Sequence, residues 1–130
     1  MSSVLIKKVE TRTELKEFIE FHYDLYKGNA YDVPNLYSDE LNTLRKDRNA
    51  AFDFCEAEYF LAYKDGKIVG RVAAIINNLA NEKWNQKSVR FGWIDFIDDR
   101  EVSAALMKAV EDYGRSKGMT EMVGPLGFTD

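Results

Sequence analysis

Residues 57–77, AEYFLAYKDGKIVGRVAAIIN, decide the fold of this chain. Two apolar, strand-like runs flank the pair Asp65-Gly66, and such a pair is typical of a two-residue type I′ hairpin turn, whose central positions both need a positive φ. Gly70, within the second run, indicates a bulge or a close approach of another segment to the backbone. We therefore predict a β-hairpin in this stretch.

The residues before the hairpin predict a strand and then a helix. The apolar-rich run at residues 4–9 is typical of a strand. Thr11 and Glu14 then have the spacing of a capping box, which marks the start of a helix, and Gly28 is a helix stop. The helix has one apolar stripe, made of Leu15, Phe18, Ile19, His22, Leu25 and Tyr26. A short second helix, capped by Ser38, is expected to follow.

The residues after the hairpin predict a loop, a strand, a helix and a last strand. Residues 77–87 are polar and indicate a loop, whereas residues 88–97 (SVRFGWIDFI) are rich in the aromatic and β-branched residues of strands. Asp98 and Asp99 open a long amphipathic helix that ends at Gly118. The run TEMVG at residues 120–124 is the last predicted strand.

The order of these elements is β-α-(α)-β-β-β-α-β, which defines the fold class as α/β (α+β) with a mixed sheet and flanking helices. A strand–helix–strand unit makes a right-handed crossover between parallel strands, so residues 88–97 should pair parallel to residues 120–123. The sequence contains no linker or repeat, and we therefore expect one domain over residues 1–130.

Composition narrows the classes of function. The net charge is −4 with 31% charged residues, which disfavours nucleic-acid binding because phosphate contacts need a concentrated positive face. Neither a long apolar run nor a signal-peptide start is present, so a cytoplasmic protein without membrane contact is expected. Cys55 is the single cysteine and His22 the single histidine. A disulfide and a histidine-rich metal site are therefore not expected, and Cys55 is interpreted as structural.

Three segments carry a resemblance to a known family: FCEAEYFLAYKDGKIVGRVAAIIN (54–77), RFGWIDFIDD (90–99) and GPLGFTD (124–130). Together with the order of elements, they resemble the GNAT superfamily of acyl-CoA-dependent N-acyltransferases, and more narrowly the amino-terminal part of a group of longer bacterial GNAT-like proteins. The resemblance implies that the fold continues with another helix and two more strands, so that this chain is a GNAT-like domain lacking its carboxy-terminal part.

The resemblance also implies where acetyl-CoA or another acyl-CoA would bind. In the family, the fourth strand pairs with the pantetheine arm, and a loop patterned Q/R-x-x-G-x-G/A aims backbone amides at the pyrophosphate. The corresponding residues here are Phe96, Ile97, Arg100, Val102, Ser103 and Ala104. Asp98 stands at the Q/R position, Glu101 at the first glycine and Ser103 at the G/A position, so the loop is degenerate. We expect weak binding of CoA and no acyl transfer by this chain alone.

Two readings of function remain open. The first is an N-acyltransferase domain that acts on a small-molecule or peptide amine. The alternative is a non-catalytic GNAT-like module for dimerisation, as a homodimer, or for binding a partner. A row of tyrosines, Tyr23, Tyr26, Tyr31 and Tyr37, indicates either an acceptor groove or burial under a loop.

Asp95 is the one candidate catalytic residue. A carboxylate on the strand at 88–97 could take a proton from an amine if burial raised its pKa. Strand alternation favours the other reading, in which Asp95 points outward, opposite to Ile94 and Phe96. His22 lies in the apolar stripe of the first helix, which favours a packed, hydrogen-bonded side chain over a catalytic base.

Overall fold

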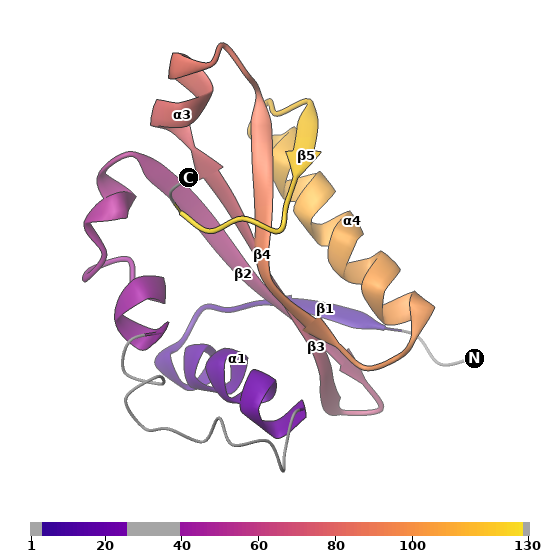
Figure 1. Ribbon diagram of the computed structural model, residues 1–130. Helices are drawn as coiled ribbons and strands as arrows, with labels where there is room; N and C mark the ends of the chain where they lie inside the picture. The colour runs from indigo at the N-terminus through magenta and orange to yellow at the C-terminus, as the bar shows by residue number, and fades with distance from the viewer. Residues whose placement is uncertain (1–3, 26–39, 129–130) are drawn as a thin grey trace.

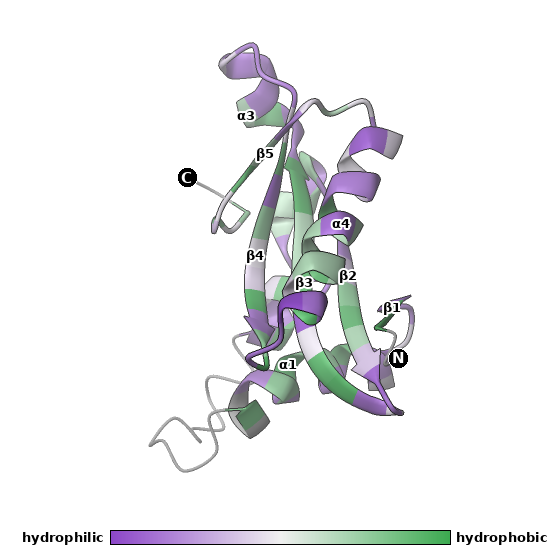
Figure 2. Ribbon diagram, turned by 90° about the vertical axis from the view of Figure 1, so that its right-hand side faces the viewer, coloured by the Kyte–Doolittle hydropathy of each residue, from purple (hydrophilic) through white to green (hydrophobic). Residues whose placement is uncertain are grey.

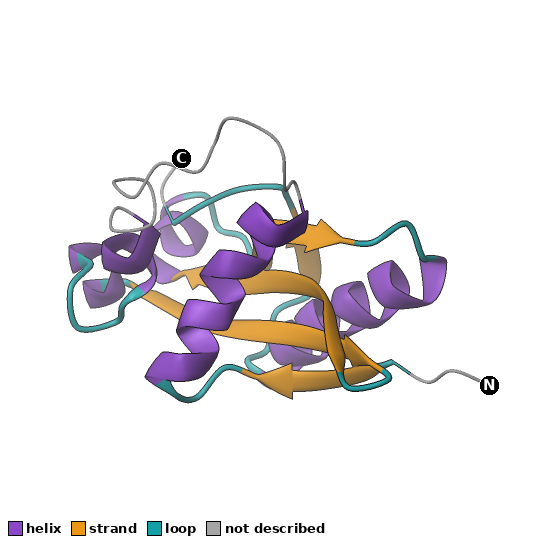
Figure 3. Ribbon diagram, turned by 90° about the horizontal axis from the view of Figure 1, so that it is seen from below, coloured by secondary structure: helices purple, strands orange, loops and turns teal. Residues whose placement is uncertain are grey.

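The computed structural model describes residues 4–25 and 40–128. Figure 1 shows one twisted sheet with α1 against one face and α4 against the other, and Figure 3 shows the same arrangement from below. The elements in chain order are β1 (Leu5–Lys8), α1 (Arg12–Leu25), the 3-10 turn η1 (Ala50–Asp53), β2 (Cys55–Lys64), β3 (Lys67–Asn77), α3 (Asn78–Lys83), β4 (Ser88–Phe96), α4 (Arg100–Ser116) and β5 (Glu121–Val123). Residues 40–44 are also helical.

The sheet is mixed and its strand order is β1-β2-β3-β4-β5. The first four strands are antiparallel neighbours, whereas β4 and β5 are parallel, with Ser88 opposite Glu121 and Arg90 opposite Val123. This confirms the parallel pair that the strand–helix–strand order predicts. The fold class predicted from the sequence is likewise confirmed.

The hairpin that joins β2 and β3 turns at Asp65 and Gly66, whose φ angles of 53° and 78° are both positive. At Gly70 the structure shows both features predicted from the sequence, an irregularity in the strand pairing and a close approach of another segment. The register of the hairpin shifts beside it, with Ala62 opposite Gly70 but Tyr63 opposite Ile68. A Cβ atom at Gly70 would also lie 2.9 Å from side-chain carbons of Leu106 and Val102, so glycine lets α4 approach the sheet closely.

Each face of the sheet has its own apolar core. On the face that α1 covers, the core contains buried side chains of α1, the 40–44 helix and the strands, among them Phe18, Ile19, Leu44, Tyr59 and Ile75. The face that α4 covers is centred on Val72, Val102, Leu106 and Val110. α4 is amphipathic, and Figure 2 shows both apolar and polar residues along it. β3 is therefore buried on both faces, which explains its nearly continuous apolar sequence.

The capping box of α1 forms as predicted. The backbone N–H of Glu14 donates to Thr11 Oγ1 at 3.1 Å, and the N–H groups of Glu10 and Thr11 donate to Glu14 Oε1 at 2.9 and 3.0 Å. Lys7 contacts Glu14 Oε2 at 2.8 Å. The hydrogen bond with Lys7 and the backbone donors lower the pKa of Glu14 to about 2.

The loop predicted for residues 77–87 is wrong in one part, because it contains the short helix α3. Asn77 caps this helix, with its side chain accepting from the N–H of Ala80 at 2.9 Å. No described residue of α3 is buried, so the apolar periodicity that announces longer helices is missing here.

Candidate active site

The two parallel strands β4 and β5 separate soon after they begin. Their pairing covers only residues 88–90 of β4. From Trp93 to Phe96 the edge of β4 has no neighbouring strand on that side among the residues that the structure describes. The sheet is thus split at this point, and the start of α4 follows directly at the end of the split (Figure 1).

A bulge lies in β4 at the split. Between the pairs Arg71–Asp95 and Ala73–Gly92, β3 has one residue whereas β4 has two, Trp93 and Ile94. Trp93 has a φ of 45°. A positive φ is strained for a bulky side chain, and such strain concentrates at functional sites.

The backbone groups on the free edge of β4 can be assigned from the hydrogen bonds on its other edge. The N–H of Ile97 donates to the carbonyl of Val69 at 3.0 Å. Backbone groups of successive residues point alternately to the two sides of a strand, so those of Phe96 point away from β3 and toward the free edge. Of the two strand residues that the resemblance implies for pantetheine, Phe96 thus offers its backbone to a ligand, whereas the N–H of Ile97 is used within the sheet.

Residues 124–128 cross β4 next to the split, as Figure 1 shows. The N–H of Leu126 donates to the carbonyl of Phe91 at 3.0 Å. A Cβ atom at Gly92 would lie 2.4 Å from the carbonyl oxygen of Leu126, so glycine is required for this approach. Beyond the crossing, Phe128 is buried in the core on the α1 face, where its carbonyl accepts from Asn77 Nδ2 at 2.8 Å.

The start of α4 is already hydrogen-bonded. Asp99 is the N-cap, and its Oδ1 accepts from the N–H of Glu101 at 2.9 Å. The carbonyl of Asp99 accepts from the N–H groups of Val102 and Ser103, both at 3.2 Å. The side chain of Val102 is fully buried in the core, whereas those of Arg100 and Ala104 are exposed. The cap by Asp99, predicted from the sequence, is confirmed.

Lys64, at the end of β2, also reaches the start of α4. Its Nζ lies 2.6 Å from Asp99 Oδ2. The hydrogen bond between them raises the pKa of Lys64 and lowers the pKa of Asp99. Sequence reasoning missed this residue, because nothing along the chain connects residue 64 to residue 99. A cation is thus present beside the start of α4, but a carboxylate already neutralises it.

A cluster of ionisable side chains lies on the α1 face of β4. Asp95 Oδ2 lies 2.9 Å from Arg71 Nε on β3 and 2.9 Å from His22 Nδ1 on α1. Arg71 is almost fully buried, donates to the carbonyl of Phe18 at 3.0 Å and lies over the ring of Phe18. His22 keeps 34% of its side chain exposed. The hydrogen bond that the helix pattern predicts for His22 is therefore present.

The favoured prediction that Asp95 points to solvent is wrong. Alternation does place it on the face opposite to Ile94 and Phe96, but α1 covers that face, and only 12% of the Asp95 side chain is exposed. Arg71, which sequence reasoning missed, could have been noticed as one charged residue in an otherwise apolar central strand, since a buried charge needs a partner.

The other predicted residues play no part in this cluster. Cys55 is buried, and its pKa is raised by burial, as for a structural thiol. Tyr26, Tyr31 and Tyr37, and the side chain of Tyr23, lie outside the described residues. Within residues 4–25 and 40–128, no group of three or more potential metal ligands is found, and no helix is long and apolar enough to cross a membrane.

Comparison with known proteins identifies the class of this fold. A scan against protein-family models gives no match. Among curated proteins, protein YghO of Escherichia coli (strain K12) is 35% identical over 124 residues, which are 95% of this chain and 32% of that protein. The bacterial ceramide synthase of Caulobacter vibrioides is 33% identical over 122 residues, 93% of this chain and 32% of the synthase. The chain thus spans about a third of the length of these relatives.

Solved structures of GNAT proteins superpose on most of the chain. A tandem GNAT protein from the clavulanic acid biosynthesis pathway has a TM-score of 0.69 at 12% identity and matches 92% of this chain and 35% of its own. The aminoglycoside acetyltransferase AAC(6')-Iy, in complex with a CoA-containing bisubstrate analogue, has a TM-score of 0.64 at 20% identity and matches 97% of this chain and 81% of its own. The chain therefore has the GNAT fold, as the three sequence segments predict.

Proposed function

We propose that this chain is the amino-terminal GNAT domain of a longer protein that transfers an acyl group from an acyl-CoA to an amine. The observation that supports this most is the free, bulged edge of β4 next to the start of α4. An extended ligand such as pantetheine can pair with backbone groups on a free strand edge, as added strands do. Phe96 has such groups on the free edge, and the place proposed for the thioester is the bulge at Trp93.

The reaction requires from the protein orientation of the two substrates, removal of one proton from the amine and delivery of one proton to the departing thiolate. The amine nitrogen attacks the thioester carbon, a C–N bond forms, the C–S bond breaks, and the amine proton must reach an acceptor while the thiolate gains one. His22, oriented by Asp95, is the candidate acceptor, because it lies on the face opposite to α4 and is partly exposed, whereas the carboxylate of Asp95 is the counter-ion of the buried Arg71. The amine can approach from this face while the nucleotide lies at the start of α4.

The start of α4 argues for weak nucleotide binding in this chain. Three acids surround Arg100 in residues 98–101. The carboxylate and carbonyl of Asp99 already take the N–H groups of residues 101–103 that would bind a pyrophosphate. We expect a dissociation constant for acetyl-CoA no better than about the millimolar range and no measurable acyl transfer by the chain alone.

The relatives suggest the class of acceptor. One is a ceramide synthase, and the bisubstrate analogue bound by AAC(6')-Iy contains acetylneamine. Ceramide and acetylneamine are both amides of amino-bearing molecules. A small amine or amino alcohol is accordingly the proposed acceptor, with a peptide amine as the second possibility.

The test compares two thioesters that differ only in the nucleotide. Acetyl-CoA and S-acetylpantetheine are titrated into the isotope-labelled chain, and backbone amide signals are followed by NMR. Both ligands should shift the signals of residues 93–97 with similar, weak affinity. Replacing Asp98 by Arg and Glu101 by Gly together should strengthen the binding of acetyl-CoA but not that of S-acetylpantetheine.

Two results would each contradict one part of the proposal, the first the pantetheine site and the second the weak binding of the nucleotide. Absence of any shift at residues 93–97 with either ligand would mean that the edge of β4 is not a pantetheine site. Micromolar binding of acetyl-CoA by the unaltered chain at physiological salt would show that the acidic loop does bind the nucleotide.

The alternative, a non-catalytic module for dimerisation or partner binding, has one observation in its favour. Three apolar side chains near the outer edge of the sheet, Met122, Val123 and Leu126, are between 36% and 41% exposed. Sedimentation velocity over a range of concentrations distinguishes the two, because a module of this kind should form homodimers that Met122→Lys disrupts.

A further inference from the structure

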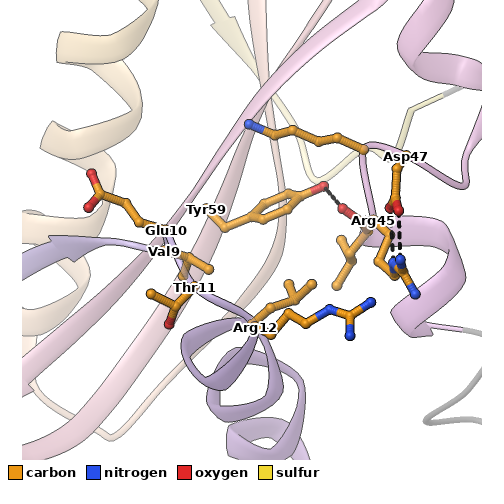
Figure 4. Close-up of a pocket in the computed structure, with 10 residues that line it drawn as sticks. Val9, Glu10, Thr11, Arg12, Arg45, Asp47 and Tyr59 are labelled. Carbon is orange, nitrogen blue, oxygen red and sulfur yellow. Dashed lines mark hydrogen bonds and ion pairs between the residues drawn. The ribbon is translucent and has the colours of Figure 1, made fainter.

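A pocket lies away from the edge of β4, between the start of α1 and the turn at residues 46–48. Its volume is about 370 Å³ (Figure 4). The apolar part of its lining that a ligand can reach consists of the half-buried side chains of Val9 and Leu15. Beneath them lie the buried Leu44 and Tyr59, whose hydroxyl donates to the carbonyl of Leu44 at 2.7 Å. The hydroxyl is thereby occupied, so this part of the pocket offers mainly carbon to a ligand.

Two guanidinium groups, of Arg12 and Arg45, line the same pocket from opposite sides, one from α1 and one from the segment after the 40–44 helix. Asp47 fixes Arg45 with two hydrogen bonds, from Nε at 2.9 Å and from a terminal nitrogen at 2.6 Å. Arg12 has no hydrogen bond or ion pair with any residue of the described ranges 4–25 and 40–128. One charge at the pocket is therefore compensated, and the other is not.

The acids around the pocket do not change this balance. Both carboxylate oxygens of Asp47 are used by Arg45. The carboxylate of Glu10 points away from both arginines in Figure 4. Lys46, the third cation of the lining, is 54% exposed and lies 4.0 Å from Glu58, so this weak ion pair leaves it as a further positive charge beside the pocket.

Backbone amides at the start of α1 are hydrogen-bonded within the capping box. The amides of Glu10 and Thr11 donate to the Glu14 carboxylate, and the amide of Glu14 donates to Thr11. These three amides are therefore not available to an anion, and the positive charge at the pocket comes from its side chains.

We propose that this pocket binds a small ligand with an oxyanion group, a carboxylate or a phosphate, attached to an apolar body. Guanidinium groups bind both oxyanions through paired N–H donors, and the bond between Arg45 and Asp47 keeps one of the two arginines oriented before a ligand arrives. The apolar body lies against Val9 and Leu15. The site is separate from the edge of β4 and does not depend on acyl transfer.

Four probes test the two parts of the site in the isotope-labelled chain: phenyl phosphate, benzoate, inorganic phosphate and phenol. We expect phenyl phosphate or benzoate to shift the amide signals of residues 9–15 and 44–47. Whichever of the two binds should bind more tightly than inorganic phosphate or phenol, because only it uses both the guanidinium groups and the apolar lining. Binding of one but not the other identifies the oxyanion and supports the proposal either way.

Variants of α1 then test the role of Arg12. Arg12→Gln should weaken binding about tenfold, the effect of losing one charge-assisted hydrogen bond, and Arg12→Lys should restore part of it. Lys16→Gln is the matched control, since Lys16 lies on the same helix outside the pocket and pairs only weakly with Glu20 at 3.7 Å. Its binding should equal that of the unaltered chain.

Three results would overturn the proposal. The first is no shift at residues 9–15 and 44–47 with any probe at millimolar concentration. The second is an equal loss in Arg12→Gln and Lys16→Gln, which would mean that net charge alone matters. The third is tighter binding of inorganic phosphate than of both aromatic oxyanions, which would exclude the apolar contact. Arg12 is exposed, so its replacement leaves the fold intact, and thermal unfolding of the variants verifies this.

Discussion

Asp99 joins the start of α4 to the end of β2 through a single side chain. One carboxylate oxygen caps α4 and the other binds Lys64, at 2.9 and 2.6 Å respectively. In a GNAT protein that binds CoA at this point, an anionic phosphate would occupy the same electrostatic position. The residue thus supplies internally the negative charge that the start of the helix favours.

Replacement of Asp99 by Ala should lower the denaturation midpoint by an amount typical of losing one helix cap. Asp98→Ala is the control, because Asp98 is exposed and is not the cap. Urea unfolding followed by circular dichroism measures both. An equal midpoint in the two variants would show that the cap contributes nothing, and would make the start of α4 available again as an anion site.

Glu14 gives the chain a specific dependence of stability on pH. Its pKa is about 2 in the folded chain against an ordinary value of 4.5, so the folded state binds protons less readily than the unfolded state. The stabilisation is therefore complete above about pH 4.5 and is lost as the pH falls toward about 2.

Glu14→Gln should remove this dependence. Thermal midpoints of the variant and the unaltered chain should differ most near neutral pH and should converge as the pH falls through that window. A difference that stays constant down to pH of about 2 would mean that Glu14 acts through packing or uncharged hydrogen bonds.

At the scale of the element, β4 is two half-strands with different partners. The first half pairs on both sides, and the second half, after the bulge at Trp93, pairs only with β3 among the described residues. Residues 124–128 separate the two halves, since Leu126 bonds to Phe91 just before the bulge.

Gly92→Ala should therefore destabilise the chain by about 1–3 kcal/mol, because a Cβ atom 2.4 Å from the carbonyl oxygen of Leu126 forces the backbone apart. Gly127→Ala is the matched control in the crossing segment itself, where the nearest atom would be 3.8 Å away. It should change the free energy of unfolding by no more than about 0.5 kcal/mol. Equal effects of the two substitutions would show that residues 124–128 do not press against β4 in solution.

Local signals in the sequence predict most of these elements. Asp65-Gly66 defines the hairpin and Thr11 with Glu14 defines the start of α1, because each signal is a hydrogen-bonded or dihedral requirement of adjacent residues. α3 was missed because six exposed residues carry no apolar periodicity. The exposure of Asp95 was misjudged because alternation gives the face of a strand but not what covers that face. Lys64 and Asp99 meet only through tertiary structure, so no local pattern contains that pair.

At the scale of the whole molecule, Arg71, Asp95 and His22 connect the sheet to the layer of α1. Oδ2 of Asp95 lies 2.9 Å from Nε of Arg71 and 2.9 Å from Nδ1 of His22. Arg71 is 2% exposed, so its charge depends on this partner. A buried ion pair of this kind is costly to break from one side only.

Asp95→Ala should lower the free energy of unfolding by about 3–5 kcal/mol, since it leaves the buried charge of Arg71 without its counter-ion. The double replacement Arg71→Met with Asp95→Val should recover a large part of that loss, because an apolar pair of similar volume needs no compensation. Chemical denaturation measures the free energy of unfolding of the single and the double variant. A double variant no more stable than Asp95→Ala would mean that the shape of the site, and not the isolated charge, is responsible.

The order of the strands in the sheet is the same as their order along the chain. When β2 and each later strand leave the ribosome, the strand with which they pair has therefore already been made. No later strand has to be inserted between two earlier ones. Closing short loops costs less entropy than closing long ones, so a sheet of this kind can assemble progressively from β1 toward β5 during synthesis. Folding of the emerging chain pulls on the ribosome and releases a translational arrest. When the length of the emerged chain is increased step by step, the fraction of released chains should rise first once the β2–β3 hairpin has emerged. It should rise again once α4 has emerged and covers the sheet.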